Sequence, residues 1–179
     1  MTKPICFANF PDINEDISAQ SKSYHFKTSL SFINKAILNE LIELGNKEKT
    51  NARISMHSSS DNLLHNMIIM QQKGTYNRPH KHPQKAEAYH LIYGEQIIII
   101  FNSQGDVIDK CFMSLQNHII YRFEKDLFHM SIPISDMVIF HESKIGPFVR
   151  KGDSVFPDWA PAVDKTNEID WFIKNIGVI

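Results

Sequence analysis

Apolar residues recur at helical spacing in one segment near the start of the chain. They fall three or four residues apart on one face, at Phe32, Ile33, Ala36, Ile37, Leu41 and Leu44. Ser31 stands where an N-terminal cap belongs, and Gly45 stands where a C-terminal cap glycine belongs. The pattern predicts an amphipathic helix over Phe32–Leu44.

From residue 53 onward the pattern changes to short β-prone runs, which are Met67–Met70, Ala88–Tyr93, Gln96–Phe101, Val107–Met113, His118–Phe123, Met130–Ile134 and Met137–His141. Turn-forming residues separate them, among them Gly74, Pro83, Gly94 and Asn117. Many short strands without intervening helices predict an all-β antiparallel sandwich or barrel.

The two ends of the chain carry weaker patterns. Residues 1–25 show no sustained periodicity, and residues 146–161 are rich in Gly, Pro and aromatic residues and are expected to cover one edge or mouth of the barrel. Residues 168–176 suit either a short helix or a strand. We therefore expect an extension with one helix over 1–52, a barrel over 53–145 and a covering tail over 146–179.

The composition excludes several classes of protein. The hydrophobic content of 42% suits a globular core, and a net charge of −1 lacks the basic excess of a nucleic-acid-binding protein. Cys6 and Cys111 match no metal or redox spacing and are expected to be reduced thiols. Neither a signal peptide nor a membrane span is visible, so the expected location is the cytoplasm.

Side chains of the kinds that bind transition metals lie close together at His80, His82 and Glu87. On an extended strand, alternate side chains share one face, so both imidazoles point the same way. Pro83 begins a connection of usual hairpin length, after which Glu87 returns on a neighbouring strand. The spacing predicts that these groups converge on a divalent transition metal.

His129 is the predicted fourth ligand, because two β-prone runs and a turn after Gly94 bring it back across the barrel. Such a set leaves a coordination position for water or substrate, as in reactive metal sites. His90 lies at odd spacing from Glu87 and should face away from the metal. We expect hydrogen-bonded rather than ligating roles for His25, His57, His65, His90, His118 and His141.

The segment Gly74-(five residues)-His80-Lys-His82-(four residues)-Glu87-(six residues)-Gly94 resembles the first motif of the cupin superfamily at every defined position. The second motif of that superfamily survives only at His129, since Glu124 and Asp126 occupy its Pro and Gly positions. The resemblance implies a cupin fold, that is, a double-stranded β-helix or jelly-roll barrel. Here the barrel would carry a short N-terminal helical segment and an irregular C-terminal tail.

The chain further resembles the WbuC family of cupin-fold metalloproteins over residues 30–161. The supporting segments are Arg53–His57, Arg78–His82, Glu142–Phe148 and Asp158–Pro161. That resemblance implies a metal site and a context of bacterial O-antigen or other surface-polysaccharide synthesis, without an assigned reaction.

Several other side chains are candidates to contact a substrate. Tyr89 and Tyr93 share the face of Glu87 by alternation, and Tyr76 and Arg78 share the face of the paired histidines. Lys144 in the tail motif is a further candidate. An arginine there could grip a carboxylate or phosphate in bidentate fashion, although a solvated strand end explains it equally well.

Three interpretations of function follow. The first is a metal-dependent enzyme acting on a sugar or nucleotide-sugar, by isomerisation, epimerisation, hydrolysis or, with iron, oxygenation. The second is a non-catalytic module that binds or senses a small ligand through its metal. The third, a metal-free epimerase with a histidine base, does not require so many imidazoles. The ligand set suits Fe, Zn, Ni or Mn, and a homodimer is expected by analogy.

Overall fold

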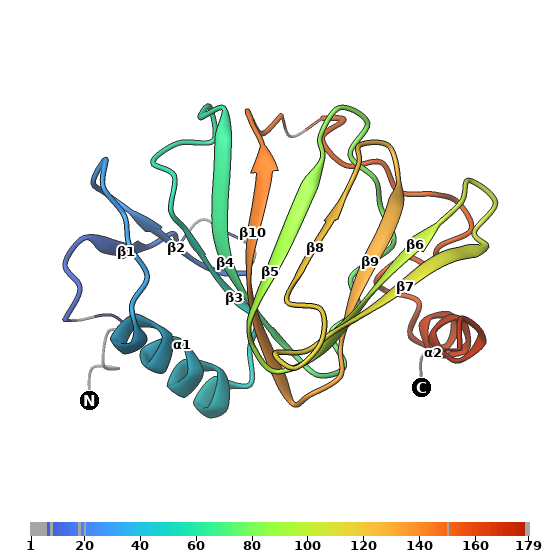
Figure 1. The fold of residues 1–179 in the computed structure, drawn as a ribbon, viewed down its shortest axis with the longest axis horizontal. Coiled ribbons are helices and arrows are strands. Elements are labelled where there is room, and N and C mark those ends of the chain that lie inside the picture. Colours follow the sequence, from blue (N-terminus) through green and yellow to red (C-terminus); the bar gives the residue numbers. More distant parts are fainter. Residues whose placement is uncertain (1–6, 8, 18, 20, 150, 178–179) are drawn as a thin grey trace.

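The strands of the protein form two sheets that pack face to face (Figure 1). The computed structural model describes residues 7, 9–17, 19, 21–149 and 151–177. The larger sheet has the order β1 (Ile13–Glu15), β2 (Lys22–Phe26), β3 (Ala52–Ser55), β4 (Leu64–Gln72), β10 (Met137–Ile145), β5 (Glu87–Tyr93), β8 (Ile120–Phe123). The smaller sheet has the order β7 (Val107–Met113), β6 (Gln96–Phe101), β9 (Phe128–Pro133).

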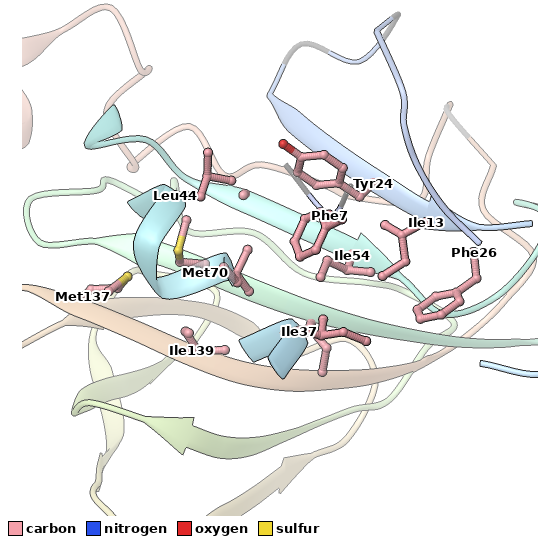
Figure 2. Close-up of a cluster of buried hydrophobic side chains, with 13 residues drawn as sticks. Phe7, Ile13, Tyr24, Phe26, Ile37, Leu44, Ile54, Met70, Met137 and Ile139 are labelled. Atoms are coloured by element: carbon pink, nitrogen blue, oxygen red, sulfur yellow. The ribbon is translucent and has the colours of Figure 1, made fainter. Parts of the chain in front are cut away.

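Alternation along the strands gives the large sheet two different faces. Its outer face packs against helix α1 (Lys35–Glu48), and Figure 2 shows Ile37 and Leu44 of the helix beside Met70 and Ile139 of the sheet. Its inner face meets the small sheet in a second apolar cluster, which includes Leu91, Ile98, Met113 and Phe140. Burial of these side chains provides the main driving force for the packing of the layers.

The small sheet is covered on its other side by helix α2 (Thr166–Asn175). Phe172 of the helix packs with Phe101 and Trp159, and Phe128 and Met130 of the small sheet belong to the same cluster. Residues 168–176, which the sequence left open between helix and strand, are therefore mostly helical. The amphipathic pattern is satisfied because one apolar face lies on the sheet.

Helix α1 confirms the predicted segment, but both predicted caps are wrong. Asn34, not Ser31, accepts the amide of Ile37 at 3.0 Å. Gly45 is buried inside the helix, where an added Cβ would lie 2.6 Å from the sulfur atoms of Met70 and Met137. The glycine thus permits close packing of helix on sheet, and Lys49, with a φ of 49°, is the C-terminal cap.

The cap gives a stability prediction. Asn34→Ala should reduce the free energy of unfolding by about 1 kcal/mol, because the Ile37 amide loses its acceptor. Urea unfolding measures the change, and Ser31→Ala is the matched control, with little expected effect. Equal losses in the two variants would contradict the assignment of the cap.

The predicted β-prone runs all coincide with strands, and the all-β prediction is confirmed. The N-terminal segment differs from expectation, because residues that showed no periodicity contain β1 and β2. Strand β2 pairs in parallel with β3, from Lys22 opposite Ala52 to His25 opposite Ser55. Such pairing is long-range, so short local patterns do not reveal it.

Two smaller predictions concern cysteines and membranes. Cys111 is buried and has a free thiol, whereas Cys6 lies outside the described residues. Within the ranges that the structure describes, no helix combines the length and hydropathy needed to cross a membrane.

Candidate metal centre

Strands and an extended segment bring the predicted ligands to the inner face. His129 is in β9, and Glu87 is the first residue of β5. The predicted hairpin between His82 and Glu87 is wrong. The segment of His80 and His82 instead forms isolated bridges, His80 with His129 and Lys81 with Val155. Flanking prolines, Pro79 and Pro83, lack amide donors and disfavour a continuous ladder.

Each of the three histidines directs one ring nitrogen toward a backbone carbonyl oxygen. The Nδ1 atom lies 3.0 Å from Arg78 O in His80 and 3.0 Å from Leu127 O in His129, and that of His82 contacts Asp153 O. A carbonyl oxygen only accepts hydrogen bonds, so Nδ1 carries the proton and Nε2 presents its lone pair. Protein metal ligands are oriented in this way.

The Nε2 atoms and the Glu87 carboxylate converge. The ligand atoms of His80, His82 and His129 lie within 4.8 Å of one another. Glu87 Oε1 is 3.0 Å from His82 Nε2, and Oε2 is 3.1 Å from His129 Nε2. Among the described residues, the buried His129 Nε2 atom has no hydrogen-bond partner. The three histidines therefore fit a metal ion, and the Glu87 carboxylate lies beside two of them.

The charge states agree with this fit. Burial, followed by the proximity of His129, lowers the pKa of His80 to about 3, so its ring is neutral near pH 7. Burial by itself would raise the pKa of Glu87, but His129, His82 and Lys144 hold it well below its usual value. A neutral imidazole and an ionised carboxylate are the forms that bind metals.

Charged residues surround the ligands. Lys144 Nζ lies 3.3 Å from Glu87 Oε1 and 3.6 Å from Glu142 Oε1. Burial and the nearby Glu87 raise the pKa of Glu142. Asp153 pairs with Lys85, and its Oδ2 atom lies 3.6 Å from His82 Nδ1. Sequence reasoning missed Asp153, because the fold alone brings the tail against His82.

A cavity of about 540 Å³ opens from the ligands along the inner face of the large sheet. Near His129 it is lined by linked polar groups: Asn77 Nδ2 donates to Ser131 Oγ at 2.9 Å, and Ser131 Oγ donates to Gln71 Oε1 at 3.3 Å. Amides and hydroxyls can exchange such bonds with the hydroxyl groups of a substrate.

The predicted substrate contacts divide into two groups. Tyr89 and Lys144 line the cavity. Tyr76, Arg78 and Tyr93 are not among its lining residues. The hydroxyl of Tyr76 donates to Pro161 O at 3.0 Å, and Tyr93 is 44% exposed at the end of β5.

Arg78 is held by the tail rather than directed into the cavity. Its guanidinium donates to Pro157 O at 3.2 Å and to Ala160 O at 3.1 Å, and it lies over the ring of Phe156. These bonds occupy guanidinium donors that would be needed to bind a carboxylate or phosphate of a substrate in bidentate fashion. Arg78 therefore anchors residues 157–160 next to the ligand segment.

Three other histidines, His25, His57 and His65, line the cavity although the sequence gave them no place there. The alternation of Arg53, Ser55 and His57 is the signal that could have placed one of them on the inner face. His90 is exposed on β5, as its odd spacing from Glu87 predicts.

Comparisons with known proteins agree with the geometry. Residues 33–113 match a family described as "Domain of unknown function (DUF6016)". No curated protein matches the chain. Among solved structures, the capsular polysaccharide assembling protein CapF from Staphylococcus aureus is similar, with a TM-score of 0.52 and 15% identity over 59% of this chain and 29% of that chain.

A second crystal form of CapF from the same organism gives a TM-score of 0.51 and 14% identity over 60% of this chain and 31% of that one. The chain thus spans less than a third of the CapF chains that it matches, and identity this low shows likeness of fold alone. These similarities and the packed sheets confirm that the chain has an all-β cupin fold.

Proposed function

We propose that the chain is a metal-dependent cupin that acts on a sugar or nucleotide-sugar intermediate of bacterial surface-polysaccharide synthesis. The observation that carries this proposal is the convergence of ligand atoms from His80, His82 and His129, with the Glu87 carboxylate next to His82 and His129, in the wall of a cavity of about 540 Å³. The Nδ1 bonds to backbone carbonyls hold the imidazoles in the ligating tautomer before any ion arrives.

A metal held by His80, His82, Glu87 and His129 would polarise a carbonyl or hydroxyl oxygen, or activate a water. The surrounding residues have other tasks. The ammonium of Lys144 stabilises negative charge that develops on the substrate. The carboxyl oxygen of Glu142, next to Lys144, can hold or move a proton. Gln71, Asn77 and Ser131 orient hydroxyl groups.

The polysaccharide context is supported by two likenesses. CapF is named as a capsular polysaccharide assembling protein, and the sequence resembles the WbuC family over residues 30–161. The ligand set suits iron, zinc, nickel or manganese. We propose a cytoplasmic location, and a homodimer by analogy with other cupins.

Turnover is tested by incubating the metal-loaded protein with UDP-, GDP-, CMP- and dTDP-linked sugars and recording mass and stereochemical changes. We expect conversion of at least one of these, reduced at least about a hundredfold in His82→Ala, because the polarising ion is lost. Conversion that survives in His82→Ala would contradict metal dependence. Tight binding without any conversion would instead favour the non-catalytic binding module.

A further inference from the structure

The cavity has a second polar end, which the metal ligands do not use. There Arg53, Ser55 and His57 line it at alternate positions along and just beyond β3. His25 of β2 also lines it and is the register partner of Ser55. We call Arg53, Ser55, His57 and His25 the outer site. Their side chains share one face of neighbouring strands, so they surround the position above Ser55.

Arg53 is held in place by a hydrogen bond that does not involve the terminal nitrogens of its guanidinium. Its Nε atom donates to Ser23 Oγ at 3.0 Å. Within the described part of the chain, the terminal nitrogens of its guanidinium make no hydrogen bond or ion pair. A planar guanidinium fixed at one edge keeps donors available on the other.

His57 is also held rigidly. Its ring stacks on that of the buried His65 at 4.0 Å, with 12° between the planes. His65 is fixed in turn by a bond from Nε2 to Ser60 O at 3.1 Å. Ser58, Ser59 and Ser60 line the cavity next to these rings. Hydroxyl groups and imidazoles therefore stand beside the arginine.

The register fixes how far the outer site lies from the metal ligands. Ser55 pairs with Met67, Met67 with Glu142, and Glu142 with Tyr89, two residues from Glu87. Three inter-strand steps of roughly 4.8 Å place the backbone of Ser55 about 14 Å from that of Tyr89. A sugar that carries a phosphate or a nucleoside diphosphate is long enough to contact side chains on both of these strands.

We propose that the outer site binds a phosphoryl group of an elongated substrate whose other end reaches the histidine cluster. This inference rests on the proposed function for the identity of the sugar end. A tetrahedral phosphoryl group presents oxygens in several directions, which suits the guanidinium of Arg53 and the hydroxyl of Ser55 as donors. Asp16 also lines the cavity, and its negative charge opposes an anion there, so Arg53 must supply the attraction.

The test is calorimetric titration with inorganic phosphate, glucose, glucose 1-phosphate and UDP-glucose. Glucose 1-phosphate should bind more tightly than either phosphate or glucose. Arg53→Gln should weaken binding of the phosphorylated probes about tenfold or more and leave glucose binding and metal content unchanged. Arg122→Gln is the matched control, since Arg122 is exposed and paired with Glu124.

The outcomes separate the two proposals. UDP-glucose that binds more tightly than glucose 1-phosphate identifies a diphosphate as the natural group, and the reverse order identifies a monoester. Phosphate binding that depends on Arg53 in chelator-treated protein supports the outer site even if metal dependence fails. Affinities unchanged in both Arg53→Gln and His57→Asn, or a parent protein that binds no phosphorylated probe at millimolar concentration, would overturn it.

Discussion

His82→Ala protein should retain less than about a tenth of the metal that the parent protein holds, which we expect to be about one equivalent. His82 Nε2 lies 3.0 Å from Glu87 Oε1, and its side chain is 3% exposed. Water from the surface therefore does not easily take the place of the lost imidazole. Removal leaves three donors around an enlarged space and the Glu87 carboxylate without one of its two imidazole partners. Elemental analysis after mild purification measures the loss.

His90→Ala is the matched control for this experiment. His90 belongs to β5, as Glu87 does, but it is exposed and faces away from the cavity. Its removal should leave the metal content at the parental value. A His82→Ala protein that folds, as judged by its circular dichroism, and still holds about one equivalent would refute the ligand assignment. A parent protein with almost no metal would do so too.

Gly94→Ala should be among the most destabilising single substitutions in the barrel. Gly94 has a φ of +77°, which L side chains rarely adopt, and an added Cβ would collide with the carbonyl oxygen of Met137 and the hydroxyl of Ser135. The left-handed backbone costs about 1–2 kcal/mol, and relief of the collision requires that the start of β10 move. We expect the free energy of unfolding to fall by about 3 kcal/mol or more.

Gly74→Ala separates the two causes. Gly74 has a φ of +83°, but apart from its chain neighbours no atom of the described residues lies within 4 Å of an added Cβ. It should therefore lose only the backbone contribution, about 1–2 kcal/mol. Denaturant unfolding of both variants measures the difference. If Gly94→Ala lost no more stability than Gly74→Ala, the close approach of β10 to Gly94 would not be the cause.

The arrangement of the site explains why so many buried polar groups are compatible with a stable fold. Buried donors and acceptors destabilise a protein unless they are paired. Here the Nδ1 atoms face backbone carbonyls, and Lys144 and Lys85 pair with Glu87 and Asp153. The His129 Nε2 atom is left for a cation. A metal-free epimerase would need one positioned base, and this structure orients three imidazoles toward one point.

The sequence by itself determined the seven strands from β4 to β10, the position of helix α1 and the three histidines, His80, His82 and His129, that the fold brings together. These features depend on local information: alternation of apolar residues, helical periodicity, and the spacing of His80, His82 and Glu87 between two glycines. His129 also followed from its place in the chain, although only one residue of its motif survives. Such patterns can be recognised in the sequence because each spans only a few residues.

Only the tertiary structure decided how those pieces meet. The hairpin expected between His82 and Glu87 is absent, because His80 bridges to His129 on β9 and Glu87 pairs with Lys144 on β10. Residues far apart in the chain supply the carbonyl that orients His82 and the acceptors that retain Arg78. The parallel pairing of β2 with β3 brings His25 beside Ser55 at the outer site. Contacts between distant segments leave no periodic trace in the sequence, and they determine which side chains share the cavity.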